Sequence, residues 1–469
     1  MKKEIRRFFG PNRTVFEASA PGRLDVMGGF GDYSGSWVLQ MPIAERTTVF
    51  LAWTNLPSIR IHSSAAQGMG FQPELEVPLR VLGNKKIPVE YEILQKVLQS
   101  NHSSAWAAYV IGCFAVLLRE KGVELPGADI WIESNVPFGK GVSSSAAIEV
   151  AAMTAICESR GLNPGLTELP ILAQKVENFV VGAPCGLMDQ LTSHLGEKDR
   201  LLPILCQPDR VAAPIDVPNG IRFVGIDSGV RHAVSGASYT DVRTAAFMGY
   251  SLIASLEGAT REDLKRARKS GDWSGLPYGG FLANIPPSIF ETRYKARLPE
   301  RMKGRAFLEE FGRTTDAITK PSRKIFYAVR PCVTHPVHEN HRVRVFSLLL
   351  EDLNRGKLTL ALRREHLEAL GEMMYQAHAG YTACRIGNEV TDAIVEAVRA
   401  AGPSCGVHGA KITGGGSGGS VCVLCEGAKG VATAKRIARE ISDRYGHPPL
   451  LLLGSSDGAR KTGVKRITT

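Results

Sequence analysis

The sequence predicts a mixed α and β fold, organised as two domains or as one large bilobed unit. Three observations support this prediction. The chain has 469 residues, which is too long for one ordinary domain. Its 44% hydrophobic and 22% charged residues are typical of a soluble globular protein. In the first half, strand-like runs alternate with long helical runs, as in mixed folds.

The strand-like runs of the first half read TTVFLAW, ADIWIES and IRFVGID, and they are rich in β-branched and aromatic residues. Helical patterns cover residues 105–120, 143–159 and 167–180. The longest uncharged apolar stretch, 106–118, is shorter than the roughly 20 residues that a membrane-spanning helix needs. It predicts a buried core helix and no membrane partner. The first residues, MKKEIRRFFG, show no secretory signal.

The second half begins with a different composition. Residues 258–330 are rich in charge, Gly and Pro and have weak periodicity, which predicts an insertion or the edge of a lobe. Helical patterns return at 341–375 and 385–401. A glycine-rich turn and an alternating strand follow at 411–426, and then a helix at 427–445. The apolar segment PLLLLGSSDGA is expected to end the fold.

The net charge is +11, and much of it is local. Residues 261–344 hold 18 Lys or Arg against 9 Asp or Glu. Runs such as KRARK (265–269) are typical of a solvated helix face. A nucleic-acid surface would need interleaved aromatic residues or a binding motif, and the stretch has neither. No nucleic-acid partner is therefore predicted, and an anionic small substrate is enough to explain a basic protein.

Nine cysteines, an odd number, are scattered along the chain. They form no disulfide framework and indicate a reducing cytoplasm. Cys422 and Cys425 have C-x-x-C spacing, but they lie in the alternating run SVCVLCE. No second Cys or His pair at metal-binding spacing accompanies them. The pattern favours a strand with buried thiols over a redox or metal site.

The segment NVPFGKGVSSSAAIEVAA (135–152) joins a glycine-rich turn to a helix that begins at about Ser144. Gly139 and Gly141 let backbone N–H groups approach a ligand closely. The free N–H groups and the positive dipole end of the helix make an anion cradle. The Ser hydroxyls can cap the helix or bind a phosphate-bound Mg²⁺. The Walker A pattern is absent, and a plain N-cap after a flexible turn is equally compatible with this segment alone.

Two further glycine-rich segments occur. APGRLDVMGGFGDYSG (20–35) places Arg23, Asp25 and Asp32 among small residues, and GGGSGG (414–419) is flanked by strand patterns. Taken alone, the first segment fits a tight turn with exposed charges as well as it fits a binding site. The second is a weak phosphate-loop signal or a flexible turn.

Together and in this order, the three segments resemble the signature motifs of the GHMP kinases, the superfamily of galactokinase, homoserine kinase, mevalonate kinase and phosphomevalonate kinase. The galactokinase branch is most similar, because GAPCGLMDQLTSHLG (182–196) and VRHAVSGASYTDVR (230–243) resemble its catalytic segment and its sugar-side loop. Phrases such as GRLDVMGGFGDYSGSWVLQMP are most similar to the L-arabinokinase subgroup. The resemblance covers roughly 18–250 and 340–460.

The resemblance implies an α+β fold of two domains with the active site in the cleft between them. An N-terminal domain of the ribosomal-protein-S5-like type is expected at 1–218, with the first two motifs. A ferredoxin-like C-terminal domain is expected at 219–469, with the basic insertion at 258–330 and the third motif at 411–420.

The resemblance also implies roles for single residues. Asp189 matches the catalytic aspartate that faces the sugar's anomeric hydroxyl, and Arg23 matches the arginine beside it; the alternative for Asp189 is to cap a helix that starts at Gln190. Ser145 and Glu177 match the ligands of Mg²⁺. The residues expected to bind ATP are Pro137, Gly139, Lys140, Gly141, Val142, Ser143, Ser144, Ser145, Trp106, Gly415 and Gly416. For Trp106, a core aromatic is an equal alternative.

At the sugar side the chain departs from galactokinases, which typically carry Glu and His where this chain has Gly29 and Phe30. In the family, that Glu helps to hold the C6 hydroxymethyl group. Asp32, which matches the ligand of ring hydroxyls, is retained, as are Gly186 and Tyr239. The pattern suggests a sugar with galactose-like ring hydroxyls and no hydroxymethyl group, namely L-arabinose. A galactose O6 against Phe30 would lose a hydrogen bond of about 0.5–1.5 kcal/mol.

The resemblance therefore implies an ATP-dependent L-arabinose 1-kinase that uses Mg²⁺ and has only small-molecule partners. Galactose and a uronic acid are alternative substrates, and a uronate would use Arg231 or Arg243. A non-catalytic sugar sensor is the alternative of another class. The sequence leaves open the oligomeric state, for which a monomer is compatible. It also leaves open whether the basic insertion is a lid, an oligomer contact or an inert lobe.

Overall fold

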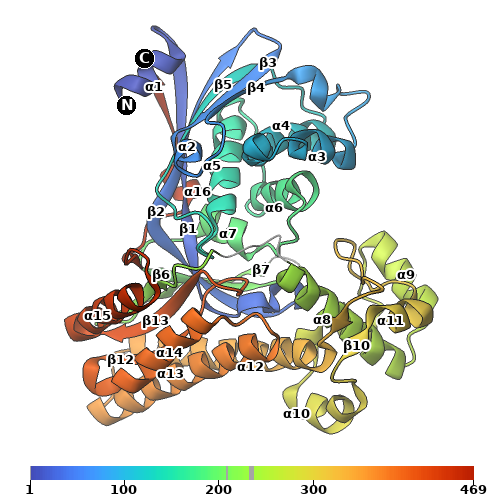
Figure 1. The fold of residues 1–469 in the computed structure, drawn as a ribbon, viewed down its shortest axis with the longest axis vertical. Helices are drawn as coiled ribbons and strands as arrows, with labels where there is room; N and C mark the ends of the chain where they lie inside the picture. Colours follow the sequence, from blue (N-terminus) through green and yellow to red (C-terminus); the bar gives the residue numbers. More distant parts are fainter. Residues whose placement is uncertain (1, 208–209, 232–236) are drawn as a thin grey trace.

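A computed structural model of the chain describes residues 2–207, 210–231 and 237–469. Residues 232–236, within the predicted sugar-side loop, lie outside this description. Figure 1 shows an upper half built on one sheet and a lower half that holds a second sheet, long helices and a lateral lobe. No helix within the described ranges is both long and apolar enough to cross a membrane.

The upper half is built on a nine-stranded sheet whose main path runs β15-β1-β2-β5-β3-β4. Its long strands follow from runs of β-branched and aromatic residues, and its pairs are antiparallel except for β3 with β5. The strands are β1 (Thr14–Met27), β2 (Trp37–Thr54), β3 (Ser58–Ser63), β4 (Glu74–Pro78), β5 (Gly127–Ser134), β6 (Arg200–Leu205), β7 (Arg210–Val211), β8 (Ile215–Asp216) and β15 (Val464–Thr468).

Most helices of this half cover one side of the sheet, where their apolar residues and those of the strands form the largest core cluster, and the N-terminal helix packs in a separate cluster with Phe50 and Trp131. The helices of this half are α1 (Lys3–Phe9), α2 (Ser64–Gly68), α3 (Tyr91–Gln99), α4 (Ala108–Lys121), α5 (Ser144–Ser159), α6 (Glu168–Lys175), α7 (Met188–Leu195) and α16 (Ala459–Thr462). The predicted core helix at 106–118 is confirmed as α4. A π-helical turn, Val176–Val181, continues α6.

The second sheet has the strand order β12-β13-β9-β14, with every pair antiparallel. The chain order β-α-β-β-α-β and this spatial order make a ferredoxin-like arrangement, as predicted. Its elements are β9 (Ile221–Asp227), α12 (Val329–Asn354), α13 (Leu360–Ala383), α14 (Glu389–Ala401), β12 (Val407–Ile412), β13 (Ser420–Glu426), α15 (Gly427–Tyr445) and β14 (Leu451–Leu452).

Strand β13 is buried on both faces, which explains the C-x-x-C spacing. Cys422 joins the cluster that packs against α12 and α13, whereas Cys425 joins the cluster under α14 and α15. Residues three apart on a strand point to opposite faces, so these two thiols cannot act as a pair. Burial raises the pKa of each to about 12. The predicted strand with buried thiols is confirmed.

The region from 258 to 330 forms most of a lateral lobe with its own apolar cluster. The elements of the whole lobe are α8 (Ala237–Leu256), which precedes this region, and α9 (Arg261–Ser270), α10 (Pro287–Ile289), β10 (Met302–Lys303), α11 (Gly304–Phe311) and β11 (Phe326–Tyr327) within it. Its cluster is continuous with Phe30 and Tyr381. The lobe is thus packed against the first glycine-rich segment.

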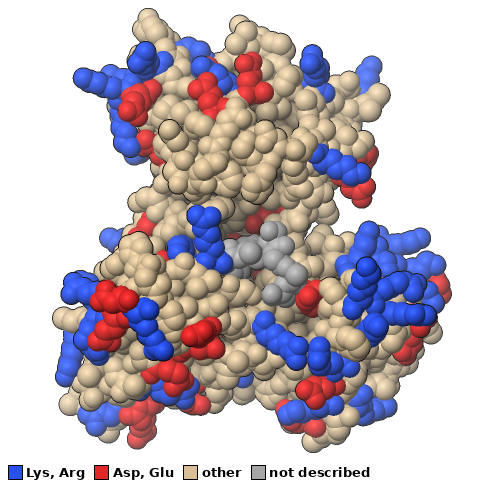
Figure 2. All heavy atoms as spheres, viewed as in Figure 1, with Lys and Arg blue, Asp and Glu red and all other residues tan. Residues whose placement is uncertain are grey.

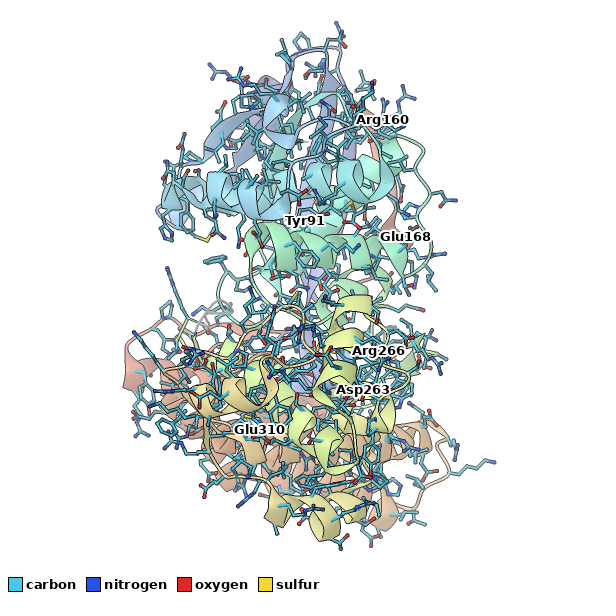
Figure 3. All side chains as sticks on the ribbon, turned by 90° about the vertical axis from the view of Figure 1, so that its right-hand side faces the viewer. Tyr91, Arg160, Glu168, Asp263, Arg266 and Glu310 are labelled. Carbon is cyan, nitrogen blue, oxygen red and sulfur yellow. The ribbon has the colours of Figure 1, made fainter. Side chains whose placement is uncertain are left out.

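The basic run 265–269 lies on α9, which buries Leu264 and Ala267 and exposes its charges. Figure 2 shows Lys and Arg side chains gathered over this lobe. Figure 3 places Asp263 and Arg266 of α9 together on its outer face, and the two form an ion pair one turn apart. The run is a solvated helix face, as predicted.

Two expectations about the second half are wrong. The helical pattern at 341–375 is divided between α12 and α13 by a break at 355–359. The apolar segment after residue 448 does not end the fold, because α16 and β15 follow it. Although β15 falls in the range expected for the second domain, it pairs with β1 of the first sheet.

Candidate active site

A cavity of about 590 Å³ is lined by residues from all three glycine-rich segments. Figure 2 shows the surface hollowed between the upper and lower halves. The first segment contributes Arg23 and Asp32, the second contributes 141–145, and the third contributes Gly415. Segments that are almost 400 residues apart in sequence therefore share one cavity.

Arg23 and Asp189 form a two-bonded ion pair on the cavity wall. Arg23, on β1, donates from Nε and Nη2 to the two carboxylate oxygens of Asp189 at 2.8 Å and 2.9 Å. Its Nη1 donates to the carbonyl oxygen of Gly141 at 2.7 Å. Burial lowers the pKa of Arg23, but the charges of Asp189 and Asp25 outweigh burial and raise this pKa. The guanidinium is therefore a fixed cation beside the carboxylate.

Asp189 lies in the first turn of α7, whose N-cap is Leu187. The alternative that Asp189 caps a helix starting at Gln190 is therefore wrong. Ser143, the N-cap of α5, makes no capping bond with its side chain; its hydroxyl donates to Asp189 Oδ2 instead. Ser143 has a φ of 58°, a left-handed conformation that is rare for residues other than Gly. This conformation turns the hydroxyl toward Asp189 rather than toward its own helix.

The second and third glycine-rich loops pack directly against each other. The Ser420 hydroxyl donates to the carbonyl oxygen of Lys140 at 2.9 Å. A Cβ at Gly414 would lie 2.8 Å from the carbonyl oxygen of Gly141, closer than real Cβ contacts. Gly139 and Gly141 have φ of 68° and 70°. Glycine is required here because the backbones are left-handed and closely spaced.

Asp32 lies in the short helical segment Gly29–Ser34 and is 3% exposed. A Cβ at Gly186 would lie 1.6 Å from Asp32 Oδ2, so only glycine fits beside this carboxyl. Burial, followed by the charge of Asp189, raises the pKa of Asp32 to about 7. Tyr239, 6% exposed, lines the same end of the cavity. The predicted sugar-side residues Asp32, Gly186 and Tyr239 are thus brought together.

Glu177 and Ser145 both line the cavity. The π-helical turn carries Glu177, and Gln190 Nε2 donates to its Oε2 at 2.7 Å and to Glu149 Oε2 at 3.1 Å. Burial, followed by the charge of Asp189, raises the pKa of Glu177 to about 7. Glu149 is fully buried, and its Oε1 has no hydrogen-bond partner among the described residues. Within the described part of the chain, the structure gives neither Glu149 nor Glu177 an ion pair with a cationic side chain.

The end of the cavity beside α4 is aromatic. Trp106 lines it together with Phe71, Tyr109 and Phe138, and Trp106 Nε1 donates to the carbonyl oxygen of Gln72 at 2.9 Å. Trp106 also packs against the main core cluster, as the core-aromatic alternative expects, and its contact with a nucleotide stays a prediction. Sequence analysis did not single out Phe71 or Tyr109 for the site. Phe138 lies within the second glycine-rich segment and is 43% exposed.

Some predicted site residues do not line the cavity. Lys140 points to the second sheet, where its Nζ lies 2.8 Å from Asp227 Oδ2. Pro137, Gly29 and Gly416 are also absent from the cavity wall. These residues shape the loops behind the wall.

The two candidate cations for a uronate differ. Arg231 lines the cavity. Arg243 is engaged elsewhere: it makes two bonds of 3.0 Å to Asp316 and donates to the carbonyl oxygen of Cys185 at 3.2 Å. Of these two arginines, Arg231 is the one that brings a cation to the wall of this cavity.

Three family models match the chain. The GHMP kinases N terminal domain matches residues 108–197, the GHMP kinases C terminal model matches 358–447, and the galactokinase galactose-binding signature matches 5–52. The chain belongs to the GHMP kinase family. The family and the fold class that the sequence predicted are therefore confirmed.

Among curated relatives of this GHMP kinase, the L-arabinokinase of Arabidopsis thaliana is 38% identical over 99% of the chain. The chain spans 48% of the length of that relative. The galactokinases of Chloroflexus aggregans and Thermosipho africanus are 29% and 26% identical over 91% and 95% of the chain, which covers 87% and 99% of their lengths.

Solved structures share the GHMP kinase fold. The galactokinase of Lactococcus lactis complexed with galactose has a TM-score of 0.71 at 19% identity, covering 99% of this chain and 98% of that one. The mevalonate kinase of Methanococcus jannaschii has a TM-score of 0.53 at 15% identity, covering 94% and 98%. At these identities the likeness shows the fold alone.

A second cavity of about 660 Å³ adjoins the first one at residues predicted to lie on the sugar side of this GHMP kinase. It shares Asp32, Cys185 and Gly186 with the first cavity, and residues 271–284 of the lobe line its far wall. The lobe therefore borders the site rather than standing apart from it.

The raised pKa of Asp32 predicts that ligand binding depends on pH. In the predicted sugar-side role of Asp32, a sugar hydroxyl donates to the ionised carboxylate, so sugar affinity should fall by about tenfold per pH unit below pH 7 and level off above it. The folded state also holds this proton more tightly than the unfolded state. The free energy of unfolding should therefore fall as the pH rises from about 4 to 7. Calorimetric titration with sugar at several pH values would measure the first effect.

Asp32→Asn is the control for that titration, because it cannot ionise. Its sugar affinity should be weak and independent of pH over the same range. A parent protein whose affinity is equally flat would show that Asp32 does not titrate against the ligand.

Proposed function

We propose that this GHMP kinase transfers the γ-phosphoryl group of ATP to the anomeric hydroxyl of L-arabinose, giving L-arabinose 1-phosphate and ADP. The observation that carries the proposal is that Asp189, with Arg23 bonded to it, and Asp32 face one cavity together with the glycine-rich loops. The choice of sugar is supported by the 38% identity to an L-arabinokinase and by Gly29 and Phe30.

The proposed reaction needs little covalent chemistry from the protein. The bond from the γ-phosphorus to the β–γ bridging oxygen breaks, and a bond to the sugar O1 forms. Asp189 orients the anomeric hydroxyl. It also accepts the hydroxyl proton, either as the final acceptor or as a relay that passes the proton to solvent. Arg23 offsets charge on the transferring group. Positioning by the loops and by Asp32 accounts for the rest of the rate enhancement.

The proposal includes a Mg²⁺ ion held by Ser145 and Glu177. Hard oxygen donors suit this ion, and among the described residues Glu177 and its neighbour Glu149 form no ion pair with a cationic side chain. Among the described residues, no group of three or more His, Cys, Asp or Glu could hold a metal alone. Two protein oxygens leave coordination positions for phosphate, as Mg²⁺ in kinases requires. The bound ion would neutralise phosphate charge.

The nucleotide is proposed to bind along residues 139–145, with its base toward Trp106 and Phe138. The loop leads into the start of α5, and the first backbone N–H groups of a helix have no partner within the helix, which favours phosphate there. Aromatic faces at the other end suit a purine.

The metal proposal predicts the behaviour of Glu177→Gln. Losing one charged ligand, worth about 1.5–3 kcal/mol, should raise the Mg²⁺ concentration needed for half-maximal binding by about tenfold or more. Titrating Mg²⁺ against the protein with a non-hydrolysable ATP analogue measures this without turnover. Glu158→Gln, on the exposed face of α5, is the matched control and should match the parent. An unchanged Mg²⁺ affinity in Glu177→Gln would remove Glu177 from the ligand set.

A sugar panel tests the function itself. Purified protein is given MgATP with L-arabinose, galactose, galacturonate or glucuronate, and ADP release is measured. L-Arabinose should give the highest kcat/KM. A uronate as best substrate would instead favour the second candidate, a uronic-acid 1-kinase, for which Arg231 in the cavity is the supporting observation. Tight sugar binding without ADP release from any sugar would favour a sensor.

The proposal places the protein in the cytoplasm. All nine cysteines are free, and most are buried. Unpaired thiols suit a reducing compartment.

A further inference from the structure

Two side chains outside every glycine-rich motif enclose the Phe30 ring. His335, on α12, stacks on Phe30 with ring centroids 3.9 Å apart and planes 13° apart. Tyr381, on α13, meets the Phe30 ring edge-on at 4.7 Å. Phe30 lines the cavity but is only 1% exposed, so it has no room to turn away. Its position is set by these two neighbours.

The Tyr381 hydroxyl occupies the space beside Gly29. A Cβ built on Gly29 would lie 2.3 Å from this oxygen, and Gly29 has a φ of 46°. The hydroxyl is held in place because it donates to the carbonyl oxygen of Gly414 at 2.6 Å. An acidic side chain at position 29 therefore cannot coexist with Tyr381 in this arrangement. Tyr381 is fully buried and links the sugar side to the third loop.

His335 acts as a flat, uncharged ring. It is buried, and neither ring nitrogen has a hydrogen-bond partner among the described residues. Burial lowers its pKa to about 3, so the ring is neutral at ordinary pH. Helix α13 comes close to it at Gly380, where a Cβ would lie 2.2 Å from His335 Nδ1. Such a ring serves packing rather than proton transfer.

The first segment is also anchored to α12 away from these rings. Gly28 N donates to Glu339 Oε1 at 3.0 Å, and Trp37 N donates to Asn340 Oδ1 at 2.9 Å. Arg342 in turn lies 2.8 Å from Glu339. With both ends fixed, Phe30 cannot shift with its backbone.

We propose that Tyr381 and His335 are specificity-determining residues of this kinase. They hold Phe30 across the end of the sugar site, and Tyr381 fills the volume that an acidic ligand for a hydroxymethyl group would need. The cavity therefore accepts a pentose and discriminates against the corresponding hexose. This inference rests on the proposed function, because it names how that site selects its sugar.

The test compares kcat/KM for L-arabinose and for galactose in the parent and in variants. Tyr381→Leu and Phe30→Ala should each raise the galactose-to-arabinose ratio by about tenfold or more, the scale of one methylene-sized change in a pocket. Tyr381→Phe keeps the ring and should keep the ratio. The change should appear in KM for galactose more than in kcat for L-arabinose.

Tyr375→Leu is the matched control. Tyr375 lies on the same helix, but it packs under Arg399 away from the cavity, and its loss should leave the ratio unchanged. Thermal unfolding checks that each variant is folded, and His335→Leu replaces Tyr381→Leu if the latter does not fold. An unchanged ratio in a folded Tyr381→Leu or His335→Leu, or an equal rise in Tyr375→Leu, overturns the inference.

The proposed function can fail separately. If the parent releases no ADP with L-arabinose, the proposed activity is wrong. Calorimetric affinities of parent and variants for the two sugars then decide the inference by the same ratio. If the parent protein binds galactose with the same affinity as L-arabinose, the inference is contradicted while the kinase activity stands.

Discussion

Replacing Asp189 with Asn is expected to lower kcat by about 10²- to 10⁴-fold, the range for loss of a general base. Asn keeps the size of the side chain but removes the charge that Arg23 pairs with and the proposed acceptor for the proton. Nucleotide binding should persist, because the loop backbone at Gly139 and Gly141 is unchanged. Steady-state kinetics with L-arabinose and a nucleotide-binding titration measure the two effects.

The control for this experiment is Asp443→Asn, which changes a carboxylate exposed on α15. Its kinetics should match those of the parent. Since Asn leaves the buried Arg23 guanidinium with a weaker partner, an unfolding curve must show that Asp189→Asn is folded. Equal turnover in a folded variant and in the parent would exclude Asp189 from the mechanism.

Replacing Lys411 with Met is expected to lower the free energy of unfolding by about 3–5 kcal/mol, the usual cost of stranding one partner of a buried ion pair. Lys411 Nζ lies 2.6 Å from Asp25 Oδ2, and both side chains are fully buried. Burial raises the pKa of Asp25, but the charge and hydrogen bond of Lys411, together with Arg23 and Gln40, outweigh burial and lower this pKa overall. Asp25 also accepts a bond from Gln40 Nε2 at 2.7 Å. The pair joins β1 to β12, and so joins the two sheets.

Denaturant unfolding of parent and variant measures this loss. Lys265→Met removes an exposed lysine that pairs only with Glu262, and it should cost about 0.5 kcal/mol or less. The double variant Asp25→Asn with Lys411→Met should recover part of the loss, because no charge is then stranded. A loss in Lys411→Met no larger than in Lys265→Met would show that the buried pair does not hold the sheets together.

Local pattern was enough to predict many elements. The β-branched run at 221–227 and the helical pattern at 427–445 match β9 and α15 to the residue. The break at 355–359 was missed because apolar periodicity on both sides is similar, and only Gly356, with a φ of 67°, marks it. Strand β15 was missed because a five-residue run is stable only with a distant partner, here β1.

The site could be predicted in part, for a different reason. The motif resemblance identified Arg23, Asp189 and Asp32, which line one cavity. It could not show that Lys140 turns away to Asp227, because loop side-chain direction depends on contacts made after folding. Tyr381 was missed as well, since its role arises only where α13 meets the first segment.

The π-helical turn after α6 has a consequence for insertions and deletions. A π turn holds one residue more than the α-helical ladder allows, which rotates the following residues by about 100° relative to α6. Glu177 lies in this turn and is aimed into the cavity by it. Deleting a single residue here should restore a regular helix and turn the Glu177 carboxylate away from the cavity. The direction of the Glu177 side chain therefore depends on the number of residues in this turn, which a point substitution does not change.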